Sequence, residues 1–204
     1  KSDVDGNSVN FNVADGLQPN GGAGGPGGND GNYINHYWDE TYNGIKYANT
    51  VISYVDRVTT LSEAIKNAYK GRAYFHRSYR YMALAFQYGD VPLVTKLLEV
   101  PKQNYKSTKK EAILEMITKD MEFAVQWMPE NTVPGAPCRA AAFHLLTKIY
   151  LAAGEFEKAV TAATTVINGK YKLMQQRFGI DASKAYRNYI WDLHRPANIH
   201  HAAN

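Results

Sequence analysis

The chain has 204 residues, of which 45% are hydrophobic, so it is long and apolar enough to form the core of one domain. Its formal net charge is only +4, and its basic residues are scattered among acidic ones. Nucleic-acid binders concentrate Lys and Arg in a stripe, so we expect no nucleic-acid partner. The single cysteine, Cys138, excludes an internal disulfide and a multi-cysteine metal site.

Residues 1–32 are rich in Gly, Asn and Asp, with a glycine run at 20–28. Such a segment cannot bury enough surface to offset its backbone entropy, so we expect a loop. A first helix is predicted from about 33 to 55. Its buried face is formed by residues spaced three and four apart, namely Trp38, Tyr42, Ile45, Asn49 and Ile52.

A second helix is predicted from the capping-box pattern Thr60-x-x-Glu63 through Gln87. Gly89 and Pro92 are its stop signals. Its buried face is expected to carry apolar residues that recur every turn or two, namely Ala64, Ala68, Phe75, Met82 and Phe86. Arg72 and Arg77 lie on the same helix, and because an unpaired buried arginine is costly, we expect acids or carbonyls to pair with them.

An irregular loop is predicted for 90–106, followed by a helix from the capping box Thr108-x-x-Glu111 to Met128. This helix has a regular apolar stripe formed by Ile113, Ile117, Met121, Ala124 and Val125.

Two further helices are predicted at 139–153 and 157–168, separated by Gly154. Their small alanines allow close antiparallel packing, and Tyr150 and Phe156 are expected to fill the wedge between them. The pattern is close to a tetratricopeptide helix–turn–helix. The sequence therefore predicts an all-α fold of tetratricopeptide-like antiparallel helix pairs with long irregular loops.

Three motifs occur in order: Trp38-x3-Tyr42-x2-Ile45-x2-Ala48-Asn49, then Gly71-Arg72-Ala73, then Tyr88-Gly89-Asp90-Val91-Pro92-Leu93. Tyr171-x-Leu173 follows the last predicted helix. This order resembles the SusD/RagB family, the lipid-anchored nutrient-binding proteins of the Bacteroidetes outer membrane. The resemblance covers about 38–173 and fades in 174–204, where 188–193 looks inserted or divergent.

The resemblance implies a division of the chain into a Gly/Asn-rich loop segment (1–32), a SusD-like helical scaffold (33–173) and a divergent loop segment (174–204). Because family members are much longer, we expect the last segment to lead into a C-terminal half that is absent from these residues. We also expect a signal peptide and a lipidated cysteine upstream.

The function that the resemblance implies is binding of an oligosaccharide or polysaccharide at the cell surface. The glycan would be delivered to a SusC-like TonB-dependent transporter, with the protein anchored to the outer membrane by an N-terminal lipid. Three alternatives remain: a RagB-like component of peptide import, a tetratricopeptide-type adaptor for protein interactions, and a glycan-active enzyme whose catalytic half is absent.

The sequence carries no Gly-x-Ser-x-Gly elbow and no His-Glu-x-x-His helix, so we predict a binding protein without catalysis or cofactor. Asp3-x-Asp5-Gly6-Asn7 resembles the start of a calcium loop, but Ala14 stands where an EF-hand needs glutamate. Three histidines lie close together in the sequence, at 194, 200 and 201. No cysteine or acidic residue accompanies them at a spacing suited to metal binding, so we predict no metal site at His194, His200 and His201.

Sugars are held by aromatic rings that stack on the sugar face and by polar groups that bind hydroxyls. That chemistry gathers where the glycine-rich segment meets the first helix, at Asp30, Asn32, Tyr33, Asn35, His36 and Tyr37. The alternative is that these tyrosines pack the edge of the scaffold. Trp191, with Tyr189 beside it, is a second aromatic candidate, whereas Trp38 begins the buried stripe and is assigned to the core.

Overall fold

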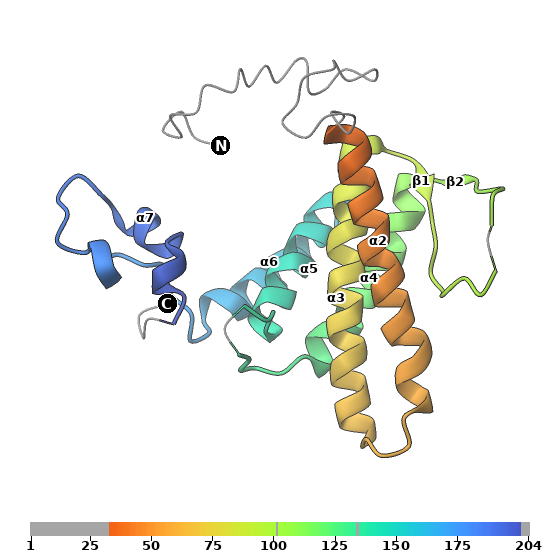
Figure 1. The fold of residues 1–204 in the computed structure, drawn as a ribbon, viewed down its shortest axis with the longest axis horizontal. Coiled ribbons are helices and arrows are strands. Elements are labelled where there is room, and N and C mark those ends of the chain that lie inside the picture. The colour runs from red at the N-terminus through yellow and green to blue at the C-terminus, as the bar shows by residue number, and fades with distance from the viewer. Residues whose placement is uncertain (1–32, 101, 134, 201–204) are drawn as a thin grey trace.

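The computed structural model describes residues 33–100, 102–133 and 135–200, with side chains from Tyr37 onward. Five long helices follow one another along the chain, and each packs on the next (Figure 1). They are α2 (Tyr33–Tyr54), α3 (Glu63–Tyr88), α4 (Lys110–Trp127), α5 (Arg139–Ala153) and α6 (Phe156–Ile167). The all-α prediction is therefore confirmed. No helix in the described ranges combines the length and apolarity needed to cross a membrane.

The shorter elements lie between and after these helices. A two-stranded antiparallel ladder joins β1 (Val91–Pro92) to β2 (Ser107–Thr108). The remaining elements are η1 (Val55–Arg57), η2 (Gly179–Asp181), α7 (Tyr189–Leu193) and η3 (Pro196–Asn198). Within the predicted loop at 90–106, the described residues form regular structure only at Val91–Pro92, so that prediction is largely confirmed.

Both predicted capping boxes are wrong. Ser62, not Thr60, caps α3, because its Oγ accepts a hydrogen bond from the Ile65 amide at 3.4 Å. Thr108 pairs with Val91 in the β-ladder and cannot cap α4. Instead, the Asp90 carboxylate accepts a hydrogen bond from the Lys110 amide at 3.0 Å. A contact between distant residues thus replaces the local cap.

The core lies between α2, α3, α4 and α5, and its largest buried side chains include Ile45, Tyr81, Leu84, Met121 and Ile149. The stripe predicted for α4 is confirmed, because four of its five members are buried and Val125 is partly buried.

The stripe predicted for α3 is wrong at both ends, where Ala64 is exposed and Phe86 is 54% exposed. The buried face of α3 instead includes Ala73, Arg77, Ser78 and Tyr81. Because α3 packs against both α2 and α4, its buried face is broad and partly polar, which hides the apolar periodicity.

The motif glycine Gly71 explains how closely α3 and α4 approach. A Cβ atom at this position would lie 3.5 Å from the Ala124 Cα and 3.2 Å from the Met128 Cγ. The absence of a side chain at position 71 therefore allows the two helices to pack closely.

The α5–α6 pair turns at Gly154, which has φ 78° and ψ 11°. The Glu155 amide then donates to the Tyr150 carbonyl at 2.9 Å, closing the end of α5. Only Ala159 and Ala162 of α6 are buried. Tyr150 is buried as predicted, but Phe156 is 64% exposed and does not fill the wedge.

Replacing Gly154 with alanine should lower the free energy of unfolding by about 1 kcal/mol, because a Cβ atom disfavours the left-handed conformation. Gly154→Asn should cost less, since asparagine tolerates this region better. Urea unfolding followed by circular dichroism measures both changes. If the alanine variant is as stable as the parent, a Cβ atom at position 154 does not strain the left-handed backbone conformation.

Candidate functional site

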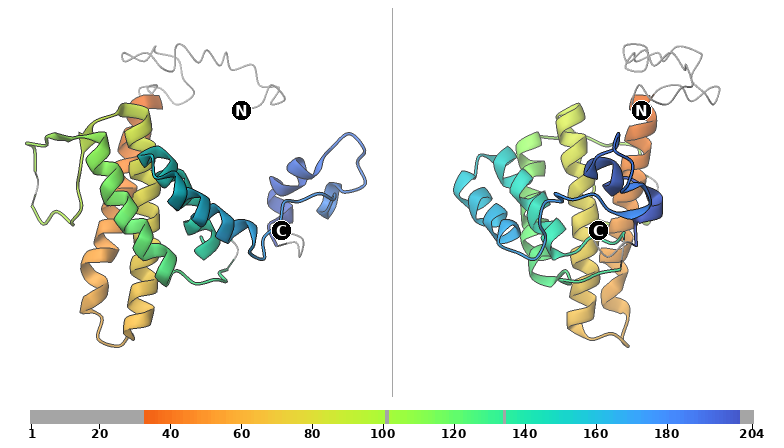
Figure 2. Two further views of the ribbon diagram at one scale, coloured as in Figure 1. Left: turned by 180° about the vertical axis from the view of Figure 1, so that it is seen from behind. Right: turned by 90° about the vertical axis from the view of Figure 1, so that its left-hand side faces the viewer.

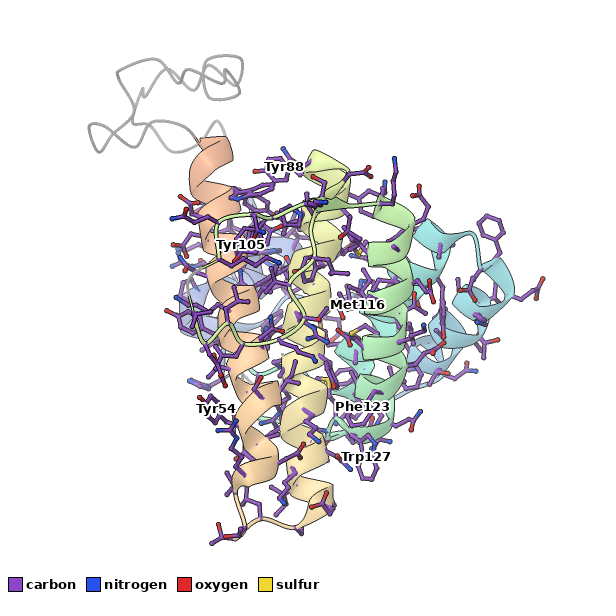
Figure 3. The ribbon with its side chains drawn as sticks, turned by 90° about the vertical axis from the view of Figure 1, so that its right-hand side faces the viewer. Tyr54, Tyr88, Tyr105, Met116, Phe123 and Trp127 are labelled. Carbon is purple, nitrogen blue, oxygen red and sulfur yellow. The ribbon has the colours of Figure 1, made fainter. Side chains whose placement is uncertain are left out.

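The N-terminal end of α2 carries a cluster of aromatic rings, which we call the aromatic apex: Tyr37, Trp38, Tyr42 and Tyr88. The Trp38 ring centroid lies 4.9 Å from that of Tyr42 and 5.0 Å from that of Tyr88, the latter edge to face. Trp38 is partly buried and packs against the core, which confirms its predicted structural role. Tyr88 lies at the end of α3 that adjoins the start of α2 (Figure 3).

Tyr37 is the member of the apex that faces solvent, with 43% of its surface exposed. It lies close enough to Tyr88 to affect that residue's titration. Burial, and secondarily the neighbouring Tyr37, raise the pKa of the Tyr88 hydroxyl above its ordinary value. Tyr37 therefore offers an accessible ring beside a packed aromatic cluster.

The other predicted site residues are located only in part. Asp30 and Asn32 lie outside the described residues. Tyr33, Asn35 and His36 belong to the first turn of α2, and their side chains are likewise outside the described part. Tyr33 precedes Tyr37 by one turn of α2.

Below the apex, residues 93–100 and 102–106 cross α2, and we call this segment the strap. Its first residues are held by Arg77, which is buried in α3. The Arg77 guanidinium makes two hydrogen bonds of 2.8 Å to the Asp120 carboxylate on α4. It also donates to the Asn49 side-chain oxygen at 2.8 Å and to the Thr95 carbonyl at 2.9 Å. The prediction that Arg77 pairs with an acid and with carbonyls is confirmed.

The matching prediction for Arg72 is not met at its Nε atom, which is buried without a hydrogen-bond partner among the described residues.

Tyr81, Asn49 and Tyr42 fix the start of the strap and the last residue of β1, which precedes it. The Tyr81 hydroxyl accepts from the Val94 amide at 2.7 Å, and the Asn49 amide donates to the Val94 carbonyl at 2.8 Å. The Tyr42 hydroxyl donates to the Pro92 carbonyl at 2.7 Å. Burial raises the pKa of Tyr81 to about 12, so its hydroxyl remains protonated at neutral pH. Motif residues of α2 and α3 thus position one loop.

Trp191 belongs to a separate C-terminal unit, residues 174–200, which lies beyond the five long helices and away from the start of α2 (Figure 2). The Arg187 guanidinium lies 3.5 Å from the Trp191 ring centroid, and the indole Nε1 donates to Asp181 at 2.9 Å. The structure therefore does not bring Trp191 together with Tyr37, and Arg187 already covers one face of its ring.

The C-terminal unit is organised around two buried carboxylates. Arg177 makes hydrogen bonds of 2.6 and 3.1 Å to Asp192, which also accepts from the Phe178 amide at 3.1 Å. Asp181 pairs with Lys184 at 2.7 Å and with Arg195 at 3.2 Å. Hydrogen bonds from Lys184 and Trp191 lower the pKa of Asp181 to about 2, and Arg177 lowers the pKa of Asp192.

The C-terminal unit should therefore lose stability only in strong acid. A carboxylate whose folded pKa is depressed stabilises the fold above its unfolded pKa of about 3.9, and the stabilisation is lost as the pH falls towards the folded value. The NMR signal of the Trp191 indole N–H should stay constant from pH 5 to 8 and move between about pH 4 and 2. Asp181→Asn should abolish this movement, whereas a midpoint above pH 5 would contradict the assigned contacts.

Metal ligands do not gather in the described part of the chain, where no group of three or more His, Cys, Asp or Glu residues is placed to hold an ion. The calcium-like pattern at 3–7 and His201 lie outside the described residues.

Comparison with known proteins connects this architecture to one family. Residues 23–151 match the model of a SusD-like family described as starch-binding and associating with the outer membrane. A curated relative, SusD-like protein P2 of Formosa agariphila, is 27% identical over 175 residues, which cover 84% of this chain and 33% of the relative.

Two solved structures extend the likeness. A laminarin-binding SusD-like protein is 25% identical with a TM-score of 0.60, over 65% of this chain and 29% of that one. A structure with a xylogluco-oligosaccharide is 27% identical with a TM-score of 0.63, over 70% of this chain and 31% of that one. The chain thus spans about a third of the length of these relatives. Since the family model matches well over half of its residues, the chain belongs to the SusD-like family.

Proposed function

We propose that this protein binds an oligosaccharide or polysaccharide at the cell surface and delivers it to a SusC-like TonB-dependent transporter. The observation that carries the proposal is the family match over residues 23–151, whose description joins starch binding to the outer membrane. Relatives that bind laminarin or a xylogluco-oligosaccharide support the same ligand class. The proposed role is binding without catalysis.

The proposed glycan surface is the start of α2, with Tyr33 and Tyr37 as stacking rings. The supporting observations are the exposure of Tyr37 and its place beside the packed apex. Polar neighbours that can bind sugar hydroxyls are Asp30, Asn32, Asn35 and His36. Trp191, whose ring is approached by Arg187 at 3.5 Å and by Arg195 at 5.7 Å, is proposed as a further aromatic contact.

The double variant Tyr33→Ala/Tyr37→Ala should weaken glycan binding by roughly 30-fold, if each ring contributes about 1 kcal/mol. Isothermal titration calorimetry with laminarin-, xyloglucan- and starch-derived oligosaccharides measures the change. Tyr79→Ala is the matched control, because Tyr79 is 60% exposed on α3. A folded double variant with unchanged glycan affinity would show that these tyrosines do not belong to the binding site.

Delivery requires a membrane location and a transporter partner. We propose that an N-terminal lipid holds the protein at the outer membrane. Fractionation of native cells, followed by capture of the protein from solubilised outer membranes, tests both points. Co-purification of a TonB-dependent transporter is the expected result, and native protein found free in the cytoplasm would contradict the proposal.

A further inference from the structure

A hollow of about 480 Å³ lies between α2 and the strap, further along α2 than Tyr37. Figure 3 shows the strap crossing α2, with Tyr105 beside that helix. The volume falls within the range of about 300–1,000 Å³ that is common for small-molecule sites. The residues that line it determine what it can hold.

One wall carries polar side chains that make no hydrogen bond within the described part of the chain, although Lys46 lies over the Tyr47 ring. Asp39, Asn43 and Lys46 follow one another at intervals of four and three residues, so they share one side of α2. None of these three side chains makes a hydrogen bond or ion pair with another described residue, and Lys96 adds a further free ammonium group from the strap. The wall therefore offers a carboxylate, an amide and two ammonium groups to a ligand.

Two tyrosine rings complete the hollow. Tyr42 forms part of its floor, and its ring is fixed by the hydrogen bond from its hydroxyl to the Pro92 carbonyl. Tyr105 comes from the far end of the strap and is 41% exposed. The Lys102 ammonium lies 5.2 Å from its ring centroid, which leaves the other face of the ring for a ligand, and its hydroxyl makes no hydrogen bond with another described residue. Apolar contacts come from Ile45, Val94, Leu97 and Leu98.

Hydrogen bonds within the protein hold both ends of the strap in place and keep the hollow open. Asn49 on its floor is bonded to Arg77 and to the Val94 carbonyl, so the near end of the strap cannot shift without breaking the buried network. Its far end is held where Ser107 and Thr108 pair with β1. A ligand would enter a site whose floor is pre-organised, which reduces the cost of binding.

Two other hollows show that this combination is specific to the strap. One of about 510 Å³ between α4, α5 and α6 contains Tyr150, but the Tyr150 hydroxyl is bonded to Glu122 and Lys158 lies over its ring. Another, of about 490 Å³, is lined by charged, small and aliphatic residues without an aromatic ring. Of these three hollows, the strap hollow alone combines a tyrosine hydroxyl and polar side chains that make no hydrogen bond with another described residue.

We propose that the strap hollow is a saccharide-binding site, separate from the proposed surface at the start of α2. A pyranose has an apolar face that stacks on an aromatic ring and an edge of hydroxyls that need donors and acceptors, and the hollow supplies both. The inference rests on the proposed glycan-binding function. It assigns Tyr105 as the stacking ring and Asn43 and Asp39 as hydroxyl partners.

Calorimetry on the 204-residue chain with laminarin-, xyloglucan- and starch-derived oligosaccharides tests the site. Tyr105→Ala and Asn43→Ala should each weaken binding about fivefold, which corresponds to about 1 kcal/mol. Tyr105→Phe should retain most of the affinity, because it keeps the ring. Tyr79→Ala should bind within twofold of the parent, and circular dichroism confirms that each variant is folded.

The outcomes separate this inference from the proposed function. If the parent binds an oligosaccharide and both Tyr105→Ala and Asn43→Ala bind it equally well, the hollow is not a saccharide site, while the proposed function stands. If the parent binds none of these oligosaccharides, the proposed function and the inference both fail.

Discussion

Replacing Arg77 with alanine should lower the free energy of unfolding by about 3–5 kcal/mol, because the change leaves a buried carboxylate without its partner. The Asp120 side chain is 10% exposed and faces Arg77 at 2.8 Å. Burial raises the pKa of Asp120, and the Arg77 guanidinium opposes this effect. Removal of the guanidinium also breaks the hydrogen bonds to Asn49 and to the strap at Thr95.

Chemical unfolding measures the effect, and an exposed ion pair provides the control. Lys119 and Glu115 pair at 2.7 Å on the surface of α4, with side chains about 70% exposed. Lys119→Ala should cost far less than Arg77→Ala, because solvent screens an exposed ion pair. The double variant Arg77→Met/Asp120→Leu should recover much of the loss, since a buried ion pair can be replaced by apolar side chains. Equal stability of Arg77→Ala and Lys119→Ala would contradict the buried network.

Replacing Tyr81 with alanine should lower the free energy of unfolding by about 3–5 kcal/mol, because it opens a cavity in the core. Tyr81 is fully buried, and its ring lies 6.4 Å from that of Tyr42. Its hydroxyl is the hydrogen-bond partner of the Val94 amide. The loss therefore combines missing ring contacts with an unsatisfied backbone donor.

Two variants separate the contribution of the Tyr81 ring to stability from that of its hydroxyl. Tyr81→Phe keeps the ring and should cost about 1–2 kcal/mol, which is the penalty for leaving the partly buried Val94 amide unpaired. Tyr79→Ala removes a ring two residues away that is 60% exposed, and should change stability by less than about 0.5 kcal/mol. Thermal and urea unfolding provide the values. A Tyr81→Phe variant as stable as the parent would show that water replaces the hydroxyl at Val94.

The helices were largely predictable because their signals are local. The stripe of α4 and the glycine stop at Gly154 each depend on residues within a few turns. The errors arose where contacts between residues far apart in the sequence determine the local structure. Asp90 reaches α4 only because β1 pairs with β2, and this pairing removes Thr108 from its predicted role. Phe156 satisfied a local pattern but lies at the first residue of α6 and is 64% exposed.

The candidate site was predictable only in its residue types. Aromatic and polar residues at the start of α2 indicated sugar chemistry, and helical spacing placed Tyr33 and Tyr37 on one side. The strap hollow was missed because it joins Asn43 to Tyr105, a residue more than 60 positions away in the chain. The regular spacing of Asp39, Asn43 and Lys46 on the outer side of α2 was a signal that the sequence did offer.

The central claim is that this protein binds glycans, and direct calorimetric titration tests it. The chain is titrated with laminarin-, xyloglucan- and starch-derived oligosaccharides and, in parallel, with a set of unmodified peptides. The account predicts saturable binding of at least one oligosaccharide and no heat of binding from the peptides. Saturable binding of peptides with no binding of any oligosaccharide would contradict it and favour a component of peptide import.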